Sequence, residues 1–414
     1  MKILVLLSRV PYPLDKGDKL RAFNQIRRLS EKHEIILCAL NDTALHNEAV
    51  PVLKQYCSDI KIINLSRFYI FFYLIRVIFN GYPLQIGYFY SGNAQKQVDD
   101  LIAKHKPDHI YCQLIRTTEY VKKHKNIPKT LDYMDAFSKG TKRRIPTAPF
   151  YLKRLLKIES KRLAKYENEI FSFFRTKTII SEQDRDLINH PEKNDIIVIP
   201  NGVDTDYFQP KPTYGDNREK PDNIKWVVDV GNQRPETSNQ RPEYDLLFTG
   251  NMNYPPNIDS VVYLVNKILP IVLKTHPEVK LLIAGTNPSK QVLKLRSGNV
   301  SVSGWVKDMR ECYAMSRIFI APMQIGIGMQ NKILEAMSMQ LPCITSPLAN
   351  NAIKAVDGES ILIGIDPGEY AGHVISLLDN CNKAKEIAIN GYNFVCSTYN
   401  WDEVNNKLEQ IISS

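Results

Sequence analysis

The feature that most constrains the fold is an alternation of short apolar strands with amphipathic helices, which restarts near residue 244. In the first half, periodicity predicts a helix over 19–32 and strands at 2–7, 34–40, 109–112, 178–180 and 196–199. Strands that alternate with helices in this way are typical of βαβ units in a parallel sheet. With 414 residues, the chain can also build two cores of roughly 200 residues each.

The second half repeats the pattern after a polar segment. We expect a helix over 258–275, with Asn257 as its cap, and strands at 245–249, 280–284, 300–302, 317–321, 342–345 and 361–363. The segment 211–243 is rich in Pro, Asn, Gln and charged residues, which indicates a linker or insertion.

The predicted fold class is therefore α/β, with two doubly wound Rossmann-like domains that face each other across a cleft. The predicted divisions are 1–210, 211–243, 244–392, and a C-terminal helix in 393–414 that packs back toward the first domain. Ligands of such sheets bind at the carboxyl ends of the strands.

One of these strand ends carries chemistry. The strand 317–321 leads into a loop with Gly326 and Gly328, and then into a helix whose first turns hold Lys332 and Glu335. A glycine loop before a helix allows close backbone approach and directs free N–H groups and the positive end of the helix dipole at an anion. With a lysine and a carboxylate added, the stretch suits a nucleotide diphosphate-sugar. An ordinary loop with chance glycines is the alternative.

Composition excludes several classes of protein. The seven cysteines form no Cys-x-x-Cys pair and no zinc-type cluster, so we predict no metal and a reducing compartment. The start of the chain, 2–7, is expected to be a strand, and no stretch approaches the roughly 20 apolar residues of a membrane span. The net charge of +10 is concentrated in residues 1–210, which hold 34 basic against 23 acidic residues.

Five motifs occur together in one order. They are Pro11-Tyr-Pro13 with Gly17, Asn201-Gly-Val-Asp-Thr-Asp-Tyr-Phe208, Phe248-Thr-Gly-Asn-Met-Asn-Tyr-Pro-Pro-Asn257, Gly304-Trp-Val-Lys-Asp308 and Gln330-Asn-Lys-Ile-Leu-Glu-Ala-Met337. In this set the chain resembles the retaining glycosyltransferases of family 4 (group 1), which have the GT-B fold, and more narrowly the sugar transferases of bacterial exopolysaccharide loci. The resemblance implies transfer of a hexose from a nucleotide-diphosphate sugar to a lipid-linked or polysaccharide acceptor hydroxyl, with retention and without a cofactor.

The resemblance also implies roles for particular residues. Lys332 would stabilise the departing diphosphate, Glu335 would accept hydrogen bonds from the ribose, and the backbone at Trp305-Val306 would hold the base. The family's first motif glutamate would fall on Ile327, so its task would pass to backbone N–H groups or to Gln324. The complete predicted donor set is Gly250, Asn251, Gly304, Trp305, Val306, Gln324, Gly326, Gly328, Met329, Gln330, Asn331, Lys332 and Glu335.

The acceptor is assigned to the first domain. The loop after the first strand supplies a glycine and three cations, which could grip a diphosphate or simply solvate the first helix. Relatives carry a histidine near residues 110–116, where this chain offers only Gln113 and Arg116. The predicted acceptor set is Lys16, Gly17, Asp18, Lys19, Arg21, Gln113 and Arg116.

Two segments of the first domain predict contact with an anionic membrane. Residues 67–90 hold ten aromatic residues, and residues 142–165 hold nine Lys or Arg against the single acid Glu159. Aromatic side chains insert at the lipid boundary while basic ones neutralise headgroups, which suggests peripheral attachment to the inner face of the plasma membrane. A buried helix and a solvated helix face are the alternatives.

Two other functions fit parts of the sequence. A sugar-nucleotide epimerase could share the fold, but it needs titratable groups at the sugar, and no histidine or paired carboxylate accompanies the loop at 324–335. A nucleic-acid-binding protein would explain the pI near 9.0, yet no zinc finger, aromatic RNA motif or recognition helix supports it. We therefore expect no nucleic acid as a partner.

Overall fold

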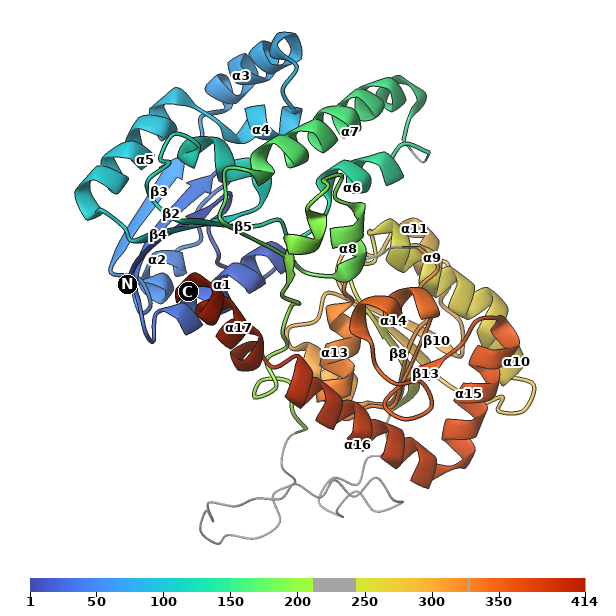
Figure 1. Cartoon of the computed structure of the whole chain (residues 1–414). Helices are drawn as coiled ribbons and strands as arrows, with labels where there is room; N and C mark the ends of the chain where they lie inside the picture. The colour runs from blue at the N-terminus through green and yellow to red at the C-terminus, as the bar shows by residue number, and fades with distance from the viewer. Residues whose placement is uncertain (147, 211–242, 326–327, 414) are drawn as a thin grey trace, which may run out of the picture. The chain divides into compact units, whose positions relative to one another are not determined.

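The computed structural model describes residues 1–146, 148–210, 243–325 and 328–413. These residues form two compact units (Figure 1). Unit 1 comprises Met1–Asn201 together with the chain from Trp401 onward, and unit 2 comprises Gly202–Asn400. The first division thus comes before the predicted boundary at residue 210. All of the predicted insertion except its last residue lies outside the described residues.

The sheet of unit 1 has seven parallel strands in the order β3-β2-β1-β4-β5-β6-β7. Their bounds are β1 Lys2–Leu7, β2 Glu34–Asn41, β3 Asp59–Asn64, β4 His109–Gln113, β5 Lys129–Asp132, β6 Thr176–Ile179 and β7 Ile197–Val198. The chain winds outward from β1 in one direction and then, from β4, in the other. This is the doubly wound arrangement that the alternating pattern predicts.

Both faces of this sheet are covered, because each strand sends alternate side chains to opposite sides. Leu4 and Leu6 of β1 belong to one hydrophobic core, whereas Ile3, Val5 and Leu7 belong to the other. The helices of unit 1 are α1 Gly17–Leu29, α2 Ala49–Leu53, α3 Arg67–Asn80, α4 Leu84–Phe89, α5 Gly92–His105, α6 Phe137–Arg143, α7 Phe150–Phe171, α8 Glu182–Leu187 and α17 Trp401–Ser413, with short 3₁₀ turns at Ile115–Val121 and Lys193–Asp195. Helices α4, α5 and α7 supply the first core, and α1, α2 and α17 the second.

The C-terminal helix α17 packs on α1 of unit 1 (Figure 1). Its Trp401 and Leu408 are buried in the same core as Ile26 of α1. Polar contacts flank this core, since the Asn405 side chain donates to the backbone carbonyl of Asn24 at 3.1 Å. The chain therefore returns to its first unit after completing the second.

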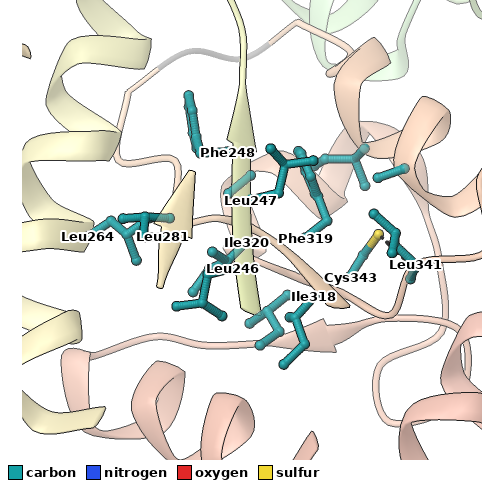
Figure 2. Close-up of a cluster of buried hydrophobic side chains, with 14 of the residues drawn as sticks. Leu246, Leu247, Phe248, Leu264, Leu281, Ile318, Phe319, Ile320, Leu341 and Cys343 are labelled. Carbon is teal, nitrogen blue, oxygen red and sulfur yellow. Dashed lines mark hydrogen bonds between the residues drawn. The ribbon is translucent and has the colours of Figure 1, made fainter. Parts of the chain in front are cut away.

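The sheet of unit 2 has six parallel strands in the order β10-β9-β8-β11-β12-β13. Their bounds are β8 Tyr244–Thr249, β9 Leu281–Ala284, β10 Val300–Gly304, β11 Ser316–Ala321, β12 Cys343–Thr345 and β13 Leu362–Ile363. Figure 2 shows side chains from β8, β9, β11 and β12 that pack in its core, among them Leu246, Leu281 and Phe319. Strands buried on both faces read as continuous apolar runs, which is why these segments were predictable.

The helices of unit 2 cover both faces of its sheet. They are α9 Pro255–Tyr263, a π-helical segment Leu264–Ile268, α10 Leu269–Val272, α11 Lys290–Leu293, α12 Met309–Ala314, α13 Asn331–Ser338, α14 Pro347–Ile353, α15 Pro367–Asp379 and α16 Cys381–Thr398. The predicted helix 258–275 begins earlier than expected, at Pro255, with Tyr254 as its cap. The prediction of Asn257 as the cap is therefore wrong, and its side chain instead accepts a hydrogen bond from Lys332.

A buried ion pair holds the end of unit 1 in place. The Arg21 guanidinium donates to Asp132 at 2.6 Å and to the backbone carbonyls of Ile199 and Pro200, the residues from which the chain leaves the unit. Arg21 and Asp132 are both fully buried. The Arg21 guanidinium and hydrogen bonds from Tyr111 and Gln25 lower the pKa of Asp132 against the opposing effect of burial. Breaking such a pair leaves a buried charge uncompensated.

We expect Arg21→Ala to destabilise unit 1 by about 3–5 kcal/mol, since it strands the Asp132 carboxylate. Hydrogen exchange of the β1 and β4 amides, followed by mass spectrometry, measures this loss directly. Arg27→Ala is the matched control, because Arg27 lies on the same helix and forms no ion pair in the described part of the chain. Equal protection in the two variants would contradict the assignment.

Candidate functional site

The sheet of unit 2 changes winding direction at β8, which lies between β9 and β11. Connections that leave in opposite directions open a crevice at the carboxyl ends of such strands. Gly250 follows β8, Gly285 follows β9, and Met323 follows β11. The predicted donor residues Gly250 and Asn251 lie at this edge of the sheet.

Lys332 extends from the first turn of α13 to this same edge. Its Nζ atom donates to Asn257 Oδ1 at 2.5 Å and lies 4.0 Å from Met323 Sδ. It also stands 4.3 Å from the centroid of the Phe248 ring, within cation–π range. The ammonium is thus enclosed by an amide oxygen, a thioether and an aromatic face, all of them neutral.

This environment changes the acidity of the lysine. Burial lowers the pKa of Lys332 to about 7, and the nearby Glu335 carboxylate only partly opposes the effect. Ammonium groups lose protons more readily where water cannot solvate the charge. An incoming diphosphate would stabilise the charged form, so anion binding at this point is coupled to proton uptake above neutral pH.

Glu335 lies one helical turn beyond Lys332 and is held from another element. The Tyr313 hydroxyl, on α12, donates to Glu335 Oε2 at 2.9 Å and exchanges a second bond of 3.1 Å with Thr249. Burial raises the pKa of Glu335 above its ordinary value, and the opposing effects of Tyr313 and Lys332 only partly offset this. A carboxylate oriented in this way can accept hydrogen bonds from sugar or ribose hydroxyls.

Two glycines make the crevice possible. Gly250 has φ +151°, and an added Cβ would lie 2.6 Å from Asn257 Nδ2 and 3.4 Å from Lys332 Nζ. Gly285 has φ +139°, and a Cβ there would meet the Gly250 carbonyl oxygen at 1.8 Å. Neither the conformation nor the space admits a side chain, so these strand ends converge only because both residues are glycine.

The structure places the other predicted donor residues around this centre. Gly304 ends β10, and its carbonyl accepts from the Gly285 N–H at 3.2 Å. Trp305 is 70% exposed, whereas Val306 packs partly against the core. The remaining predicted residues before α13 are the exposed Gln324 and Gly328, the partly buried Met329, Gln330 and Asn331, and Gly326, which with Ile327 lies outside the described residues.

Sequence reasoning missed four members of this centre: Phe248, Asn257, Tyr313 and Met323. Phe248 and Met323 are ordinary core residues by pattern, and their placement under Lys332 depends on the tertiary fold. Asn257 was visible within a quoted motif but was interpreted as a helix cap. Tyr313 lies in a short helix, and nothing in the sequence indicates that its hydroxyl group faces Glu335.

Unit 1 has a pocket of about 110 Å³ at the carboxyl ends of β1 and β2. Lys16 and Lys19 of the predicted acceptor set line it, together with Arg9, Tyr12 and His46, which were not predicted. Lys19 pairs with Asp15 at 2.8 Å, and Asp18 pairs with Arg9 at 2.8 Å. Lys16 and Gly17 are exposed at the start of α1.

Two of the predicted acceptor residues are corrected by their burial. Arg21 has no exposed surface and is committed to Asp132 and the chain near Pro200. Gln113 is 3% exposed and donates to the backbone carbonyl of Asp18 at 3.1 Å. Neither side chain can contact an acceptor directly, and both instead fix α1 against the sheet.

Arg116 is retained as a candidate. Its guanidinium lies between the rings of Phe89 and Phe137, 4.9 Å from each centroid, and its Nε atom donates to Gln85 at 2.9 Å. Burial, reinforced by repulsion from Arg9, lowers the pKa of Arg116 to about 10. The group remains cationic at neutral pH and is rigidly oriented.

Backbone strain marks the same edge of unit 1. Leu114, directly after β4, has φ +66°, and Met134, shortly after β5, has φ +62°. Non-glycine residues in such conformations cost on the order of 1–3 kcal/mol and cluster at functional sites. Asp135 follows Met134 and is exposed, so it joins Arg116 as a polar group that strained backbone presents. Sequence patterns carry no signal for this strain.

Within the described ranges, no group of three His, Cys, Asp or Glu side chains is arranged to hold a metal ion. In the same part of the chain, no helix is both long enough and apolar enough to cross a membrane.

Residues 243–380, which include the whole cage around Lys332, match the family model described as "Glycosyl transferases group 1". Unit 2 carries a group 1 glycosyltransferase domain. The match ends immediately before α16 and does not extend into unit 1. The matched range contains all the residues predicted to bind the donor, while the family 4 assignment and retention go further than this match.

One curated relative is similar over part of the chain. It is an uncharacterized 44.6 kDa protein in the cps region of Klebsiella pneumoniae, 29% identical over 169 residues. The match covers 39% of this chain and 44% of the relative, so the chain spans less than half the length of the curated relative it matches.

Solved structures match both units and confirm the predicted fold class. Sucrose-phosphate synthase from Thermosynechococcus elongatus gives a TM-score of 0.66 at 13% identity, covering 99% of this chain and 98% of its own. Anabaena HepE in complex with UDP and glucose gives 0.63 at 13% identity, covering 100% and 99%. At this identity the likeness establishes the fold alone, which is a pair of Rossmann-like units of the GT-B type.

Gly250→Ala is expected to destabilise unit 2 by about 1–3 kcal/mol, because the new Cβ requires both a strained φ and displacement of Asn257. Hydrogen exchange of the β8 and β9 amides reports the loss. Gly298→Ala serves as the control, since a Cβ there meets no atom within 4 Å. A Gly250→Ala protein as protected as the control would show that this crevice tolerates a side chain.

Proposed function

We propose that this protein is a hexosyltransferase that takes a nucleotide-diphosphate sugar as donor and elongates a lipid-linked or polysaccharide acceptor, with retention, in bacterial cell-surface polysaccharide synthesis. The observation that carries the proposal is the Lys332 ammonium, fixed among neutral groups at the carboxyl ends of β8 and β11 within a group 1 domain. The cps-region relative and the UDP complex of HepE support the biological setting and the choice of donor.

The chemistry asks unit 2 to stabilise a leaving group. The bond between the anomeric carbon and the diphosphate oxygen breaks, and its electron pair stays on the diphosphate. The acceptor oxygen forms the new bond to carbon, and its proton passes to the departing diphosphate. Lys332 and the backbone near Gly328 would bind the negative charge that develops. Glu335 would hold hydroxyl groups of the nucleotide, and the Trp305-Val306 backbone its base.

Unit 1 would hold the acceptor. Its pocket presents the cations Arg9, Lys16 and Lys19, which suit the phosphates of a lipid-linked sugar. Arg116 and Asp135 stand on the strained edge at the ends of β4 and β5, where they could orient the acceptor's hydroxyl groups. This division of work matches the charge distribution, because the excess of positive charge lies in residues 1–210.

Unit 1 also carries a surface that suits an anionic membrane. Helix α3 exposes four phenylalanines, at 66% for Phe68, 61% for Phe71, 53% for Phe72 and 83% for Phe79. After Gly81 the pattern reverses, and Ile86 and Phe89 of α4 are buried. The aromatic run thus divides into an outward-facing helix and an inward-facing one, and solvent-exposed phenylalanines on this scale indicate an interaction surface.

Helix α7 supplies the basic part of this surface. Its first turns are exposed, with Phe150 at 86% and Tyr151 at 67%, and they carry Lys153, Arg154 and Lys157. From Glu159 onward the helix packs against unit 1. An exposed helix start with aromatic and basic side chains is suited to the headgroup region of a bilayer.

Helix α7 lies beside α4 (Figure 1), and side chains of α7 make two sets of contacts with the aromatic helices. The Glu159 carboxylate accepts from the N–H groups of Leu84 and Gln85 at 2.8 and 3.1 Å, where it caps the start of α4. Arg162 donates to the carbonyls of Val77 and Tyr82 at 3.3 and 3.2 Å, near the end of α3. The single acid in the basic segment is therefore structural, and hydrogen bonds join the basic helix to the aromatic helices.

A panel of nucleoside diphosphates and their sugars tests the donor site. The donor that fits should raise the melting temperature of the full chain, because it binds only the native state. Lys332→Ala should abolish this shift, whereas Lys274→Ala, an exposed lysine of the same unit, should leave it intact. A shift that survives Lys332→Ala would show that the diphosphate binds at another site.

The stereochemistry is tested by incubation with donor and acceptor. NMR of the product's anomeric proton then separates transfer with retention from inversion or epimerisation.

Flotation with phosphatidylglycerol vesicles at low salt tests the membrane surface. Changing Arg143, Arg144, Lys153 and Arg154 to Gln should weaken binding by up to about a thousandfold, since each near-surface charge contributes about 1 kcal/mol. The control changes four exposed lysines of unit 2, Lys274, Lys280, Lys290 and Lys294, to Gln. Unchanged binding by the unit 1 variant, or equal losses in both, would contradict this surface.

A further inference from the structure

The side chain of Asn257 connects three parts of unit 2. Its Oδ1 atom accepts from Lys332 Nζ at 2.5 Å, and its Nδ2 group donates to the backbone carbonyl of Asn251 at 3.0 Å. Asn257 is only 6% exposed, and Gly250 lacks a Cβ at the point where one would strike its side chain. Both ends of the amide are therefore used, and its orientation is fixed.

The neutrality of this partner has a consequence for Lys332. The charged and titratable groups that face the lysine are Glu335, on its own helix, and Tyr313, which donates to Glu335 from α12. The groups in direct contact with Nζ, from Phe248, Asn257 and Met323, carry no charge. In the described residues no carboxylate pairs with this ammonium, so its charge stays available to an anion.

The start of α9 makes that charge more important. Pro255 and Pro256 occupy its first positions and have no N–H to offer. The first turn of α9 consequently presents few backbone donors to a ligand beside Gly250. Asn257, a residue of that turn, holds the Lys332 ammonium at the same edge, and this cation can replace the missing backbone donors.

We propose that Asn257 is the positioning residue for Lys332: its amide carbonyl fixes the ammonium at the carboxyl end of β8 without neutralising it, and so prepares the site for a nucleotide diphosphate. This inference rests on the proposed function, and it adds a residue that acts through Lys332. A carboxylate at position 257 would orient the lysine equally well but would compensate its charge. The neutral amide orients the lysine and leaves the charge uncompensated.

The titration of Lys332 tests this proposal without any ligand. Competitive acetylation with acetic anhydride, read by mass spectrometry of the Lys332 peptide in the full chain, gives the pH at which the amine becomes reactive. We expect a midpoint near 7 in the natural protein, as the lowered pKa of Lys332 implies. Asn257→Asp places a carboxylate against Nζ, so Lys332 should be at least tenfold less reactive at pH 8.5.

Asn253→Asp is the matched control. Asn253 is exposed on the loop that leads into α9, and this variant adds the same charge without a bond to Lys332. Its Lys332 should titrate as in the natural protein. Superimposable reactivity curves for the natural protein and a folded Asn257→Asp would overturn the proposal, and so would equal shifts in both aspartate variants.

If Asn257→Asp fails to fold, Asn257→Ser replaces it. Serine is too short to reach Nζ, so Lys332 should become more reactive at pH 6.5, and unchanged reactivity would overturn the proposal.

Calorimetric titration with UDP then links this position to binding. In the natural protein, affinity should fall about tenfold for each pH unit above the midpoint, because the fraction of ammonium falls by that factor. Asn257→Asp should bind UDP at least tenfold more weakly at pH 6 and lose little more up to pH 8.5. A natural pH dependence that persists in this variant would overturn the proposal. If UDP binds none of the proteins, the proposed donor is wrong, while the acetylation curves still decide the role of Asn257.

Discussion

A lysine ammonium enclosed by neutral groups is the interaction on which the candidate site of unit 2 depends. Burial of Lys332 is unfavourable for its charged form, as its lowered pKa shows. The fold nevertheless holds the lysine in this environment, because four elements surround it. They contribute Phe248 near the end of β8, Asn257 on α9, Met323 after β11, and the start of α13 itself. Functional sites commonly retain such locally unfavourable arrangements, because a charge that is already satisfied has little left to offer a ligand.

The parallel sheet explains why these residues converge. Gly250 and Gly285 allow two strand ends to approach within contact, and the change of winding at β8 leaves the space beside them open. The same topology operates in unit 1, where the winding direction changes between the neighbouring strands β1 and β4. There the strain falls on Leu114 and Met134 instead of on glycine, and the polar groups presented are Arg116 and Asp135. One architecture is thus adapted twice, for an enclosed, partly buried cation in one unit and for a strained edge in the other.

The extent to which sequence predicted these features follows from their physical origin. Buried strands such as β1 and β8 are continuous apolar runs, so their existence was evident, whereas β5, with only Lys129–Asp132, is too short and polar to be recognised. Lys332 and Glu335 were found because a glycine loop precedes them. Arg21 was misassigned, since a cation in a glycine-containing loop has the same local pattern whether it faces solvent or a buried aspartate over a hundred residues away. Long-range pairing leaves no local trace.

Asn257 shows why spacing alone cannot separate a structural role from a functional one. An asparagine before an apolar helix is a good cap, because its side chain can accept from N–H groups of the first turn. Here two prolines begin the helix one residue after Tyr254, so Asn257 lies inside the turn and its carbonyl is free to face Lys332. The prolines that shift the helix start are the same residues that remove backbone donors from it. The two prolines therefore have two effects: they weaken the start of α9 as an anion site, and they place Asn257 where it can face Lys332. Lys332 can then bind the anion in place of the missing N–H groups.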